Sequence, residues 1–333
     1  MNLNDKSVLI TGGTGSLGKA LVQEIFSSSP KIKRLVIYSR DEQKQFQMAQ
    51  DYTEIDYPAI RYFIGDIRDY ERLERAFQGI DYVIHAAAMK HVPIAEYNPD
   101  ECVKTNISGA QNVIKACLAS NSVKSVVALS TDKACSPINL YGATKLASDK
   151  LFVAANNITG SSEKRFSVVR YGNVMGSNGS VIPFFLKKKN ENRLPVTDER
   201  MTRFNISLKE GVNMVLYELE HCMGGEIMVP KIPSYRILDV AKAISEDAKI
   251  DIIGIRPGEK LHEEMISHSD SFNTYDNEDF YFILPSKTKW DIETFKSKLN
   301  AQKVDQQFSY SSDTNPHFLT KEDLKKLIKQ ELM

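Results

Sequence analysis

The sequence has few of the features that mark secreted, membrane-bound or nucleic-acid-binding proteins. Its cysteines, Cys102, Cys117, Cys135 and Cys222, form neither close pairs nor metal-ligand spacings, so they predict reduced thiols. No apolar run reaches the roughly 18 residues of a membrane-spanning helix, and residues 1–6 do not resemble a signal peptide. We therefore expect a cytoplasmic protein without a metal site and without a membrane partner.

Net charge is also lacking. The 43 Lys and Arg residues balance the 43 Asp and Glu residues, which argues against a nucleic-acid partner. No internal repeat or low-complexity segment interrupts the chain. With 333 residues, of which 42% are hydrophobic, the chain suits one large domain or two closely joined ones.

A glycine-rich loop near the start of the chain follows an apolar strand at residues 7–10 and precedes a helical pattern that ends near Phe26. Glycines at this position let the backbone approach a diphosphate at the amino end of the helix. A tight turn without a ligand is the alternative. The residues expected to hold the cofactor here are Gly12, Thr14, Gly15, Ser16, Leu17 and Gly18.

The tip of the second expected strand, residues 34–38, bears on cofactor choice. A carboxylate at this tip binds the ribose of NAD, whereas a basic residue accommodates the 2′-phosphate of NADP. We favour NADP, although the carboxylates of Asp41 and Glu42 leave contact with the ribose open. The residues predicted to contact the cofactor are Ser39, Arg40, Asp41, Glu42, Gln43 and Lys44.

Strands and helices alternate through the first half of the chain, with further strands expected at residues 60–64, 82–85, 126–129 and 166–171. This alternation predicts an α/β fold with a Rossmann-like doubly wound parallel sheet in residues 1–180. Prolines then punctuate shorter elements, so residues 181–333 are expected to form a smaller substrate-binding part and a C-terminal tail.

The segment at residues 128–145 carries the clearest chemical signal. Tyr141 and Lys145 are four residues apart at the start of an expected helix, so their side chains share one face. An ammonium beside a phenol lowers the phenol pKa, which predicts that Tyr141 can accept a proton. A solvated surface pair is the alternative, but the preceding buried strand places the pair where α/β sheets bind ligands.

This arrangement resembles the extended short-chain dehydrogenase/reductase superfamily, in which Thr131, Tyr141 and Lys145 match residues around the nicotinamide. The sugar-nucleotide 4,6-dehydratases of that superfamily carry Thr-Asp-Glu at the strand end. This chain has Thr131, Asp132 and Lys133, the pattern of the inverting UDP-N-acetylglucosamine 4,6-dehydratases that start pseudaminic acid synthesis. The resemblance runs over nearly the whole chain and is denser before residue 205.

The resemblance implies a redox-neutral reaction in which NADP is regenerated in each cycle. Tyr141, activated by Lys145, takes the proton from the sugar O4, Lys133 takes the C5 proton, and Asp132 protonates the departing O6. Reprotonation of C5 from the opposite face inverts its configuration. A free lysine has a pKa near about 10.4, so we expect burial and nearby positive charge to lower the pKa of Lys133.

The resemblance also implies further contacts. Those to the cofactor are Asp66, Ile67, Ala86, Lys90, Tyr141, Lys145, Val174, Met175, Gly176, Ser177 and Asn178. Those to a UDP-sugar are Lys90, Thr105, Asn106, Asn173, Val181, Thr197, Arg256 and Glu259. A solvated loop position for Lys90, a structural role for Asn106 and a surface ion pair for Arg256 are the alternatives. Asn178 and Asn205 depart from the family, whose members carry Arg and an aromatic residue there.

Two other functions are open at this stage. A UDP-sugar 4-epimerase needs Tyr141 and Lys145 but no elimination pair, and a non-catalytic NADP-binding regulator needs neither. The role of residues 267–321 cannot be interpreted from the sequence. A final amphipathic helix begins near Thr320 and is expected to dock on the body or on another subunit, and we expect a homo-oligomer.

Overall fold

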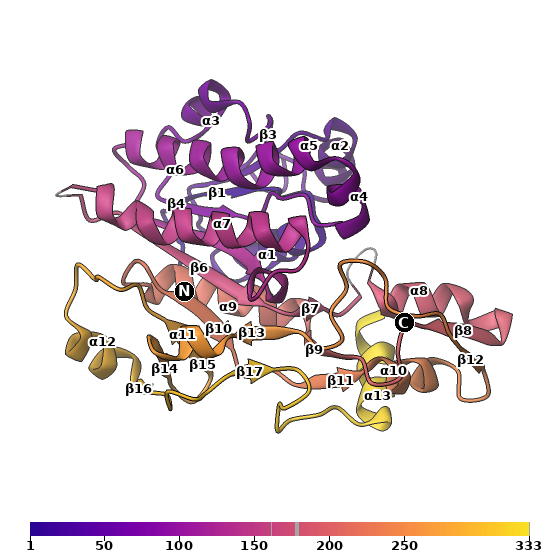
Figure 1. The fold of residues 1–333 in the computed structure, drawn as a ribbon. Coiled ribbons are helices and arrows are strands. Elements are labelled where there is room, and N and C mark those ends of the chain that lie inside the picture. The colour runs from indigo at the N-terminus through magenta and orange to yellow at the C-terminus, as the bar shows by residue number, and fades with distance from the viewer. Residues whose placement is uncertain (161, 177–179, 333) are drawn as a thin grey trace.

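A ten-stranded sheet forms the centre of the computed structural model, which describes residues 1–160, 162–176 and 180–332 (Figure 1). The strands from β3 to β10 run parallel, and the remaining edge strands are antiparallel. In spatial order they are β3 (Ile60–Ile64), β2 (Arg34–Ser39), β1 (Ser7–Thr11), β4 (Tyr82–His85), β5 (Ser125–Thr131), β6 (Arg165–Tyr171), β10 (Ile227–Pro230), β15 (Phe280–Ile283), β14 (Thr274–Asp276) and β16 (Gln302–Lys303).

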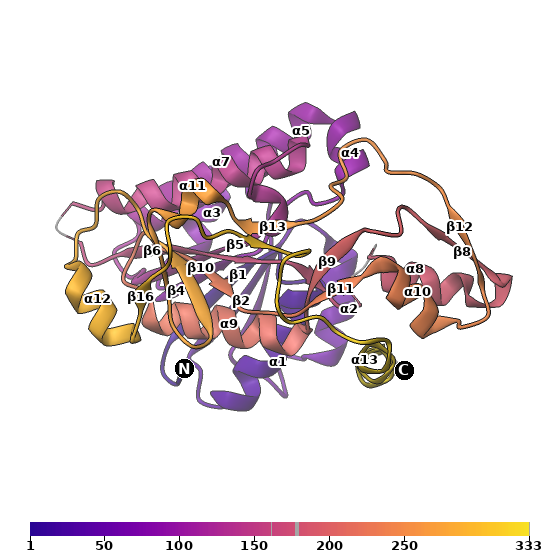
Figure 2. The same ribbon diagram turned by 60° about the horizontal axis from the view of Figure 1, so that its bottom comes forward.

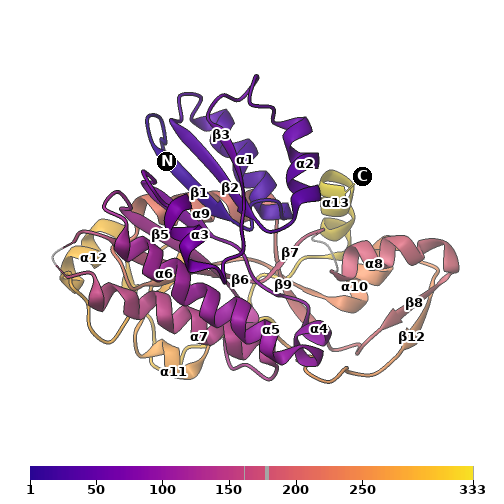
Figure 3. The ribbon, with the colours of Figure 1, turned by 90° about the horizontal axis from the view of Figure 1, so that it is seen from above.

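Helices cover both faces of this sheet, which confirms the expected doubly wound α/β fold (Figure 3). The central strands are buried on both faces, as their continuous apolar runs predict. On one face lie α3 (Tyr70–Ala76), α6 (Gly109–Ala119) and α7 (Leu140–Ala155). On the other lie α1 (Ser16–Ser28), α2 (Glu42–Asp51) and α9 (Leu208–His221).

A smaller region with its own apolar core lies beyond the carboxyl ends of the parallel strands (Figure 2). Its helices are α8 (Val181–Lys188), α10 (Ile237–Ile244) and α13 (Lys321–Leu332). Its strands are β7 (Asn173–Val174), β8 (Arg193–Val196), β9 (Thr202–Ile206), β11 (Ser234–Arg236) and β12 (Lys249–Ile252), and the pair β13 (Glu264–Ile266) and β17 (Tyr310–Ser311) lies near it.

The expected division near residue 180 separates the sheet only in part, because β10, β14, β15 and β16 all follow it in sequence and complete the sheet edge. Residues 267–321, which the sequence pattern did not explain, therefore contribute mainly edge strands. The final helix, α13, docks on α10 of the same chain. No helix in the described ranges is long and apolar enough to cross a membrane.

The helical segment from Pro99 to Ala119 is interrupted. It consists of α5 (Pro99–Val103), a π-helical turn at Lys104–Ser108, and α6. Asn106 lies in the π turn and bridges to the Met89 backbone, donating to its carbonyl (3.0 Å) and accepting from its N–H (2.8 Å). The turn thus aims a buried amide at the loop after β4, as π turns near functional sites often do.

A buried carboxyl pair lies at the amino end of β10. Glu218 on α9 lies beside Glu226, which immediately precedes β10, and both side chains are about 1% exposed. Burial, together with the Glu226 charge, raises the pKa of Glu218 well above its usual range. Glu218 therefore binds its proton more tightly in the folded state than in the unfolded state.

We expect Glu218→Gln to remove a pH dependence of stability. Because the folded-state pKa is raised, wild-type stability is fully present below the unfolded pKa near 4.5 and falls as pH rises toward the folded value. The variant should match wild type in acid and exceed it at pH 8 by about 1 kcal/mol. Urea unfolding at both pH values measures this, and a variant that is less stable at both values would contradict it.

Candidate active site

A cavity of about 690 Å³ opens at the carboxyl ends of β1, β4, β5 and β6. Parallel strands bring their carboxyl ends to one edge of the sheet, so loops distant in sequence meet there. The glycine loop, the tip of β2 and the β5–α7 segment, which were singled out in the sequence, all contribute. The predicted residues that line it are Gly12, Gly15, Ser16, Leu17, Gly18, Arg40, Lys44, Ala86, Lys90, Thr131, Lys133, Tyr141, Lys145, Asn173 and Val174.

The glycine loop fits a dinucleotide diphosphate. Gly12 has a φ of +69°, and a Cβ at this position would lie 2.8 Å from the Ala87 backbone nitrogen. Gly15 caps α1 without any side-chain hydrogen bond to the first turn, so the helix N–H groups are left for a ligand. Gly12 therefore lets this loop pack closely on the loop after β4, and the start of α1 offers the donors that a diphosphate needs.

A second cavity of about 140 Å³ adjoins the first and includes the tips of β2 and β3. Ser39 accepts or donates a 2.9 Å hydrogen bond with Thr14, which ties the two loops together. Predicted cofactor residues Ser39, Arg40, Asp66 and Ile67 line this cavity. Thr105, predicted to contact the substrate, lies here rather than in the larger cavity.

The Asp41 carboxylate is already engaged. It caps α2 by accepting a 3.0 Å hydrogen bond from the Lys44 N–H, and it also pairs with the Lys44 ammonium at 3.0 Å. Of the two carboxylates that left NAD open, Asp41 is thus committed to the helix terminus. Arg40 lines both cavities, where a phosphate on the ribose would need a cation.

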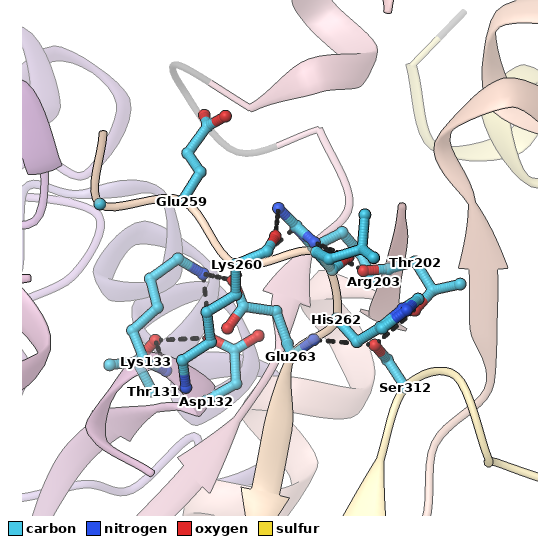
Figure 4. Close-up of polar contacts among 12 residues, drawn as sticks. Thr131, Asp132, Lys133, Thr202, Arg203, Glu259, Lys260, His262, Glu263 and Ser312 are labelled. Atoms are coloured by element: carbon cyan, nitrogen blue, oxygen red, sulfur yellow. Dashed lines mark hydrogen bonds and ion pairs between the residues drawn. The ribbon is translucent and has the colours of Figure 1, made fainter. Parts of the chain in front are cut away.

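Thr131, Asp132 and Lys133 form a compact hydrogen-bonded group at the end of β5. Asp132 Oδ1 accepts from the Thr131 hydroxyl at 2.9 Å and from Lys133 Nζ at 3.0 Å. The Asp132 side chain is 1% exposed, whereas Lys133 is 26% exposed and lines the cavity. The lysine thus lies between the cavity and a buried carboxylate (Figure 4).

Tyr141 differs from expectation in its pKa. Burial raises the pKa of the phenol to about 12, although the Lys133 charge and a hydrogen bond with Thr131 act in the opposite direction. The expected lowering is therefore wrong for this structure, because the desolvation of a phenolate outweighs the nearby cation. The Lys145 ammonium donates to the Leu129 carbonyl at 2.6 Å, and burial lowers its pKa.

The expected lowering of the Lys133 pKa is also wrong here. Burial of the ammonium lowers its pKa, but the charges of Asp132 and Glu263 outweigh burial and raise it above its ordinary value. Glu263 Oε1 lies 3.3 Å from Lys133 Nζ. Sequence reasoning missed Glu263 because it lies 130 positions from Lys133 in the chain and follows no motif with it.

A second buried pair also escaped the sequence analysis. Asp149 on α7 accepts hydrogen bonds from Ser130 (2.6 Å) and from Arg170 (3.3 Å). Its charge opposes the lowering of the Lys145 pKa by burial, but burial has the larger effect. Arg170 lies on β6 and is 2% exposed. The only sequence signal was the location of Asp149 one turn after Lys145 on the same helix.

Four further predicted residues are Lys90, Asn106, Ser177 and Asn178. Asn106 hydrogen bonds with the Met89 backbone and Thr144, so its contacts favour the structural alternative, and its substrate contact stays a prediction. Lys90 lines the cavity but is exposed, so both the predicted contact and the solvated-loop alternative stay open. Ser177 and Asn178 lie outside the described residues.

Four residues predicted to contact the UDP-sugar are absent from both cavity walls: Val181, Thr197, Arg256 and Glu259. Arg256 is 56% exposed and pairs with Glu259 at 3.9 Å, as the surface ion-pair alternative expects. The predicted cofactor residues Glu42, Gln43, Met175 and Gly176 are likewise absent from both cavity walls. The binding roles of all these residues, Val181, Thr197, Arg256 and Glu259 included, stay predictions.

Comparisons with known proteins agree with this site. Residues 8–285 match the family model described as "Polysaccharide biosynthesis protein". The chain is 57% identical, over 98% of both chains, to a Campylobacter jejuni protein named UDP-N-acetylglucosamine 4,6-dehydratase (inverting). It is also 43% identical to the UDP-glucose 4-epimerase of Rickettsia canadensis, over 84% of this chain and 83% of that protein.

Solved structures extend the comparison. Pen from Bacillus thuringiensis superposes with a TM-score of 0.89 at 40% identity, covering 99% of both chains. DesIV from Streptomyces venezuelae, a dTDP-glucose 4,6-dehydratase with NAD bound, has a TM-score of 0.67 at 21% identity over 76% of this chain and 86% of its own, and supports the fold alone. By sequence, fold and site, the chain belongs to the polysaccharide biosynthesis protein family and resembles its inverting UDP-N-acetylglucosamine 4,6-dehydratases.

Proposed function

We propose that this protein is an NADP-dependent lyase that dehydrates UDP-N-acetylglucosamine across C5 and C6 with inversion at C5. The product would be UDP-2-acetamido-2,6-dideoxy-β-L-arabino-hex-4-ulose, the first intermediate of pseudaminic acid synthesis. One observation carries the proposal: Lys133, 3.0 Å from Asp132, shares a cavity wall with Tyr141 and Lys145. An acid and a base beside an oxidation site are what an elimination requires.

The residues take separate parts in this scheme. Tyr141 removes the proton from the sugar O4, and Lys133 removes the C5 proton, which the ketone at C4 has made acidic. Asp132 protonates O6 so that water can leave. When bound, the nicotinamide supplies the reversible redox chemistry that oxidises C4 and later reduces C6. Lys145 holds the Leu129 carbonyl, and Thr131 hydrogen bonds with the Tyr141 hydroxyl, so both residues position the surroundings of Tyr141.

The test is a product analysis with the NADP-loaded protein and UDP-N-acetylglucosamine. Mass spectrometry should show loss of one water from the sugar nucleotide, and a ketone should be trapped by reduction with borohydride. A C4 epimer without water loss would indicate the 4-epimerase alternative. Unchanged substrate, with the cofactor bound, would instead support a non-catalytic regulator.

Location and assembly form part of the same proposal. The cysteines of the described chain are free thiols, which supports a reducing compartment such as the cytoplasm. Exposed apolar side chains, among them Ile94, Tyr97 and Ile138, support a homo-oligomer that covers them. Sedimentation of the purified protein would measure its mass in solution.

We expect Arg40→Ala to reduce the preference for NADP. A charge-assisted contact to the 2′-phosphate contributes about 1.5–3 kcal/mol, so the Kd for NADP should rise about 10–100-fold. The Kd for NAD should change little, because NAD lacks that phosphate. Titration of both cofactors by calorimetry measures the two values, and an equal loss for NAD and NADP would show that Arg40 does not recognise the phosphate.

A further inference from the structure

Glu263 lies directly behind Lys133 as seen from the cavity. The residue immediately precedes β13, and its side chain is only 2% exposed. Its Oε1 lies 3.3 Å from Lys133 Nζ and 3.7 Å from Arg203 Nε (Figure 4). Glu263 is absent from the cavity wall, so it reaches the cavity only through the lysine.

The surroundings of Glu263 hold it rigidly. Its backbone N–H donates to Ser312 Oγ at 2.9 Å, which fixes the start of β13. Arg203 is anchored independently, since it donates to the carbonyls of Thr202 (2.7 Å), Leu261 (3.1 Å) and Lys260 (3.0 Å). A guanidinium anchored by three backbone carbonyls therefore lies beside the Glu263 carboxylate.

The two carboxylates around Lys133 differ in what else they contact. Asp132 Oδ1 is shared between Lys133 and the hydroxyl of Thr131, whereas Glu263 Oε1 lies near both Lys133 and Arg203. Glu263 thus has a second cation beside it, whereas Asp132 hydrogen bonds with the lysine and a neutral hydroxyl. The pair thus separates into one carboxyl that works as an acid and one that stays charged.

We infer that Glu263 is a positioning residue for the elimination: its fixed negative charge stabilises the ammonium that forms on Lys133 as the C5 proton is removed. This inference rests on the proposed function. A charge already in place in a water-poor site favours the transition state without reorganisation. Glu263 acts through Lys133 and does not touch the sugar.

The protons balance in this scheme. The reacting state has a neutral Lys133 amine and a protonated Asp132. The C5–H bond breaks as a bond forms from the Lys133 nitrogen to that proton. The C6–O bond breaks as Asp132 gives its proton to O6, water leaves, and a double bond joins C5 and C6. Lys133 is then an ammonium and Asp132 a carboxylate, which is the ion pair seen here at 3.0 Å.

Hydride then returns to C6 and C5 takes up one proton, which the O4 proton held by Tyr141 balances. Transfer of one proton from Lys133 back to Asp132 across this contact then restores the reacting state. The groups that face Lys133 come from several elements. They are Asp132 on its own turn, Tyr141 on α7, Arg203 on β9, Tyr235 on β11, and Glu263. Among these neighbours Glu263 is the carboxylate held by a second cation. Its removal therefore takes away fixed negative charge and makes the lysine a weaker base.

The test compares Glu263→Gln with wild type, both loaded with NADP. We expect kcat for dehydration to fall about 100-fold. The acidic limb of the kcat/KM profile should move to lower pH by about one unit, because the variant no longer attracts a proton to Lys133. The deuterium isotope effect with UDP-N-acetylglucosamine labelled at C5 should increase, since proton removal becomes more strongly rate-limiting.

Two further variants separate this role from a structural one. Glu263→Asp keeps the charge and should restore the pH profile and most of the rate. Glu218→Gln removes a buried carboxyl near the amino end of β10, away from the cavity, and should leave the isotope effect unchanged. If Glu263→Gln loses activity with the wild-type pH profile and isotope effect, the inference is wrong. If wild type makes no dehydrated product, the proposed function itself fails.

Discussion

Lys133→Met is expected to lower kcat for dehydration by about 10³-fold. Methionine retains the length and apolar stem of the side chain but cannot take a proton from C5. Loss of a positioned general base typically costs about 10²–10⁴-fold, and Lys133 is the amine that pairs with Asp132. Steady-state turnover, followed by chromatography of the sugar nucleotide, measures the effect.

The variant should retain the first half-reaction. Oxidation at C4 depends on Tyr141, so mixing with UDP-N-acetylglucosamine should still produce the absorbance of reduced nicotinamide, which then persists. Removal of Lys133 leaves Asp132 and Glu263 without their shared cation, so a lower melting temperature is expected too. A folded Lys133→Met protein that turns over at the wild-type rate would show that another group is the base.

Tyr141→Phe is expected to abolish the reaction at an earlier step, with a fall in kcat of about 10³-fold. Without the phenol oxygen there is no acceptor for the O4 proton, so reduced nicotinamide should not form on mixing with substrate. This separates Tyr141→Phe from Lys133→Met, although both lose product. Formation of reduced nicotinamide by Tyr141→Phe at the wild-type rate would assign the O4 proton to another group.

The pH dependence of the wild-type reaction follows from the same phenol. Burial raises the pKa of Tyr141 to about 12, so the phenolate is scarce at neutral pH and its fraction increases as pH rises. Positive charge brought by the nicotinamide would lower that pKa. Cofactor binding should therefore move the ultraviolet titration of Tyr141, measured against Tyr141→Phe, to lower pH.

The sheet could be predicted from sequence because its strands are short apolar runs with β-branched residues between turn signals. The expected strands at residues 60–64 and 82–85 match β3 and β4, and the others differ by one to a few residues at their ends. The edge strands β14 and β16 were missed, since both are short and carry polar residues without alternation.

The site could be predicted only where its residues are close together in sequence. The glycine loop and the β5–α7 segment contain contiguous motifs, so their residues were found and line one cavity. Glu263 and Arg203 approach Lys133 only because β9 and the segment before β13 fold back on it. The direction of the Lys133 pKa depends on those partners, and the sequence therefore predicted it wrongly.

Proton NMR of the reaction in D₂O tests the central claim most directly. Wild-type protein, NADP and UDP-N-acetylglucosamine should give a 4-keto-6-deoxy sugar nucleotide with deuterium at C5 and the inverted configuration there. Coupling constants around the ring report that configuration. Deuterium at C5 with retained configuration, or a C4 epimer with its C6 hydroxyl intact, would contradict the account.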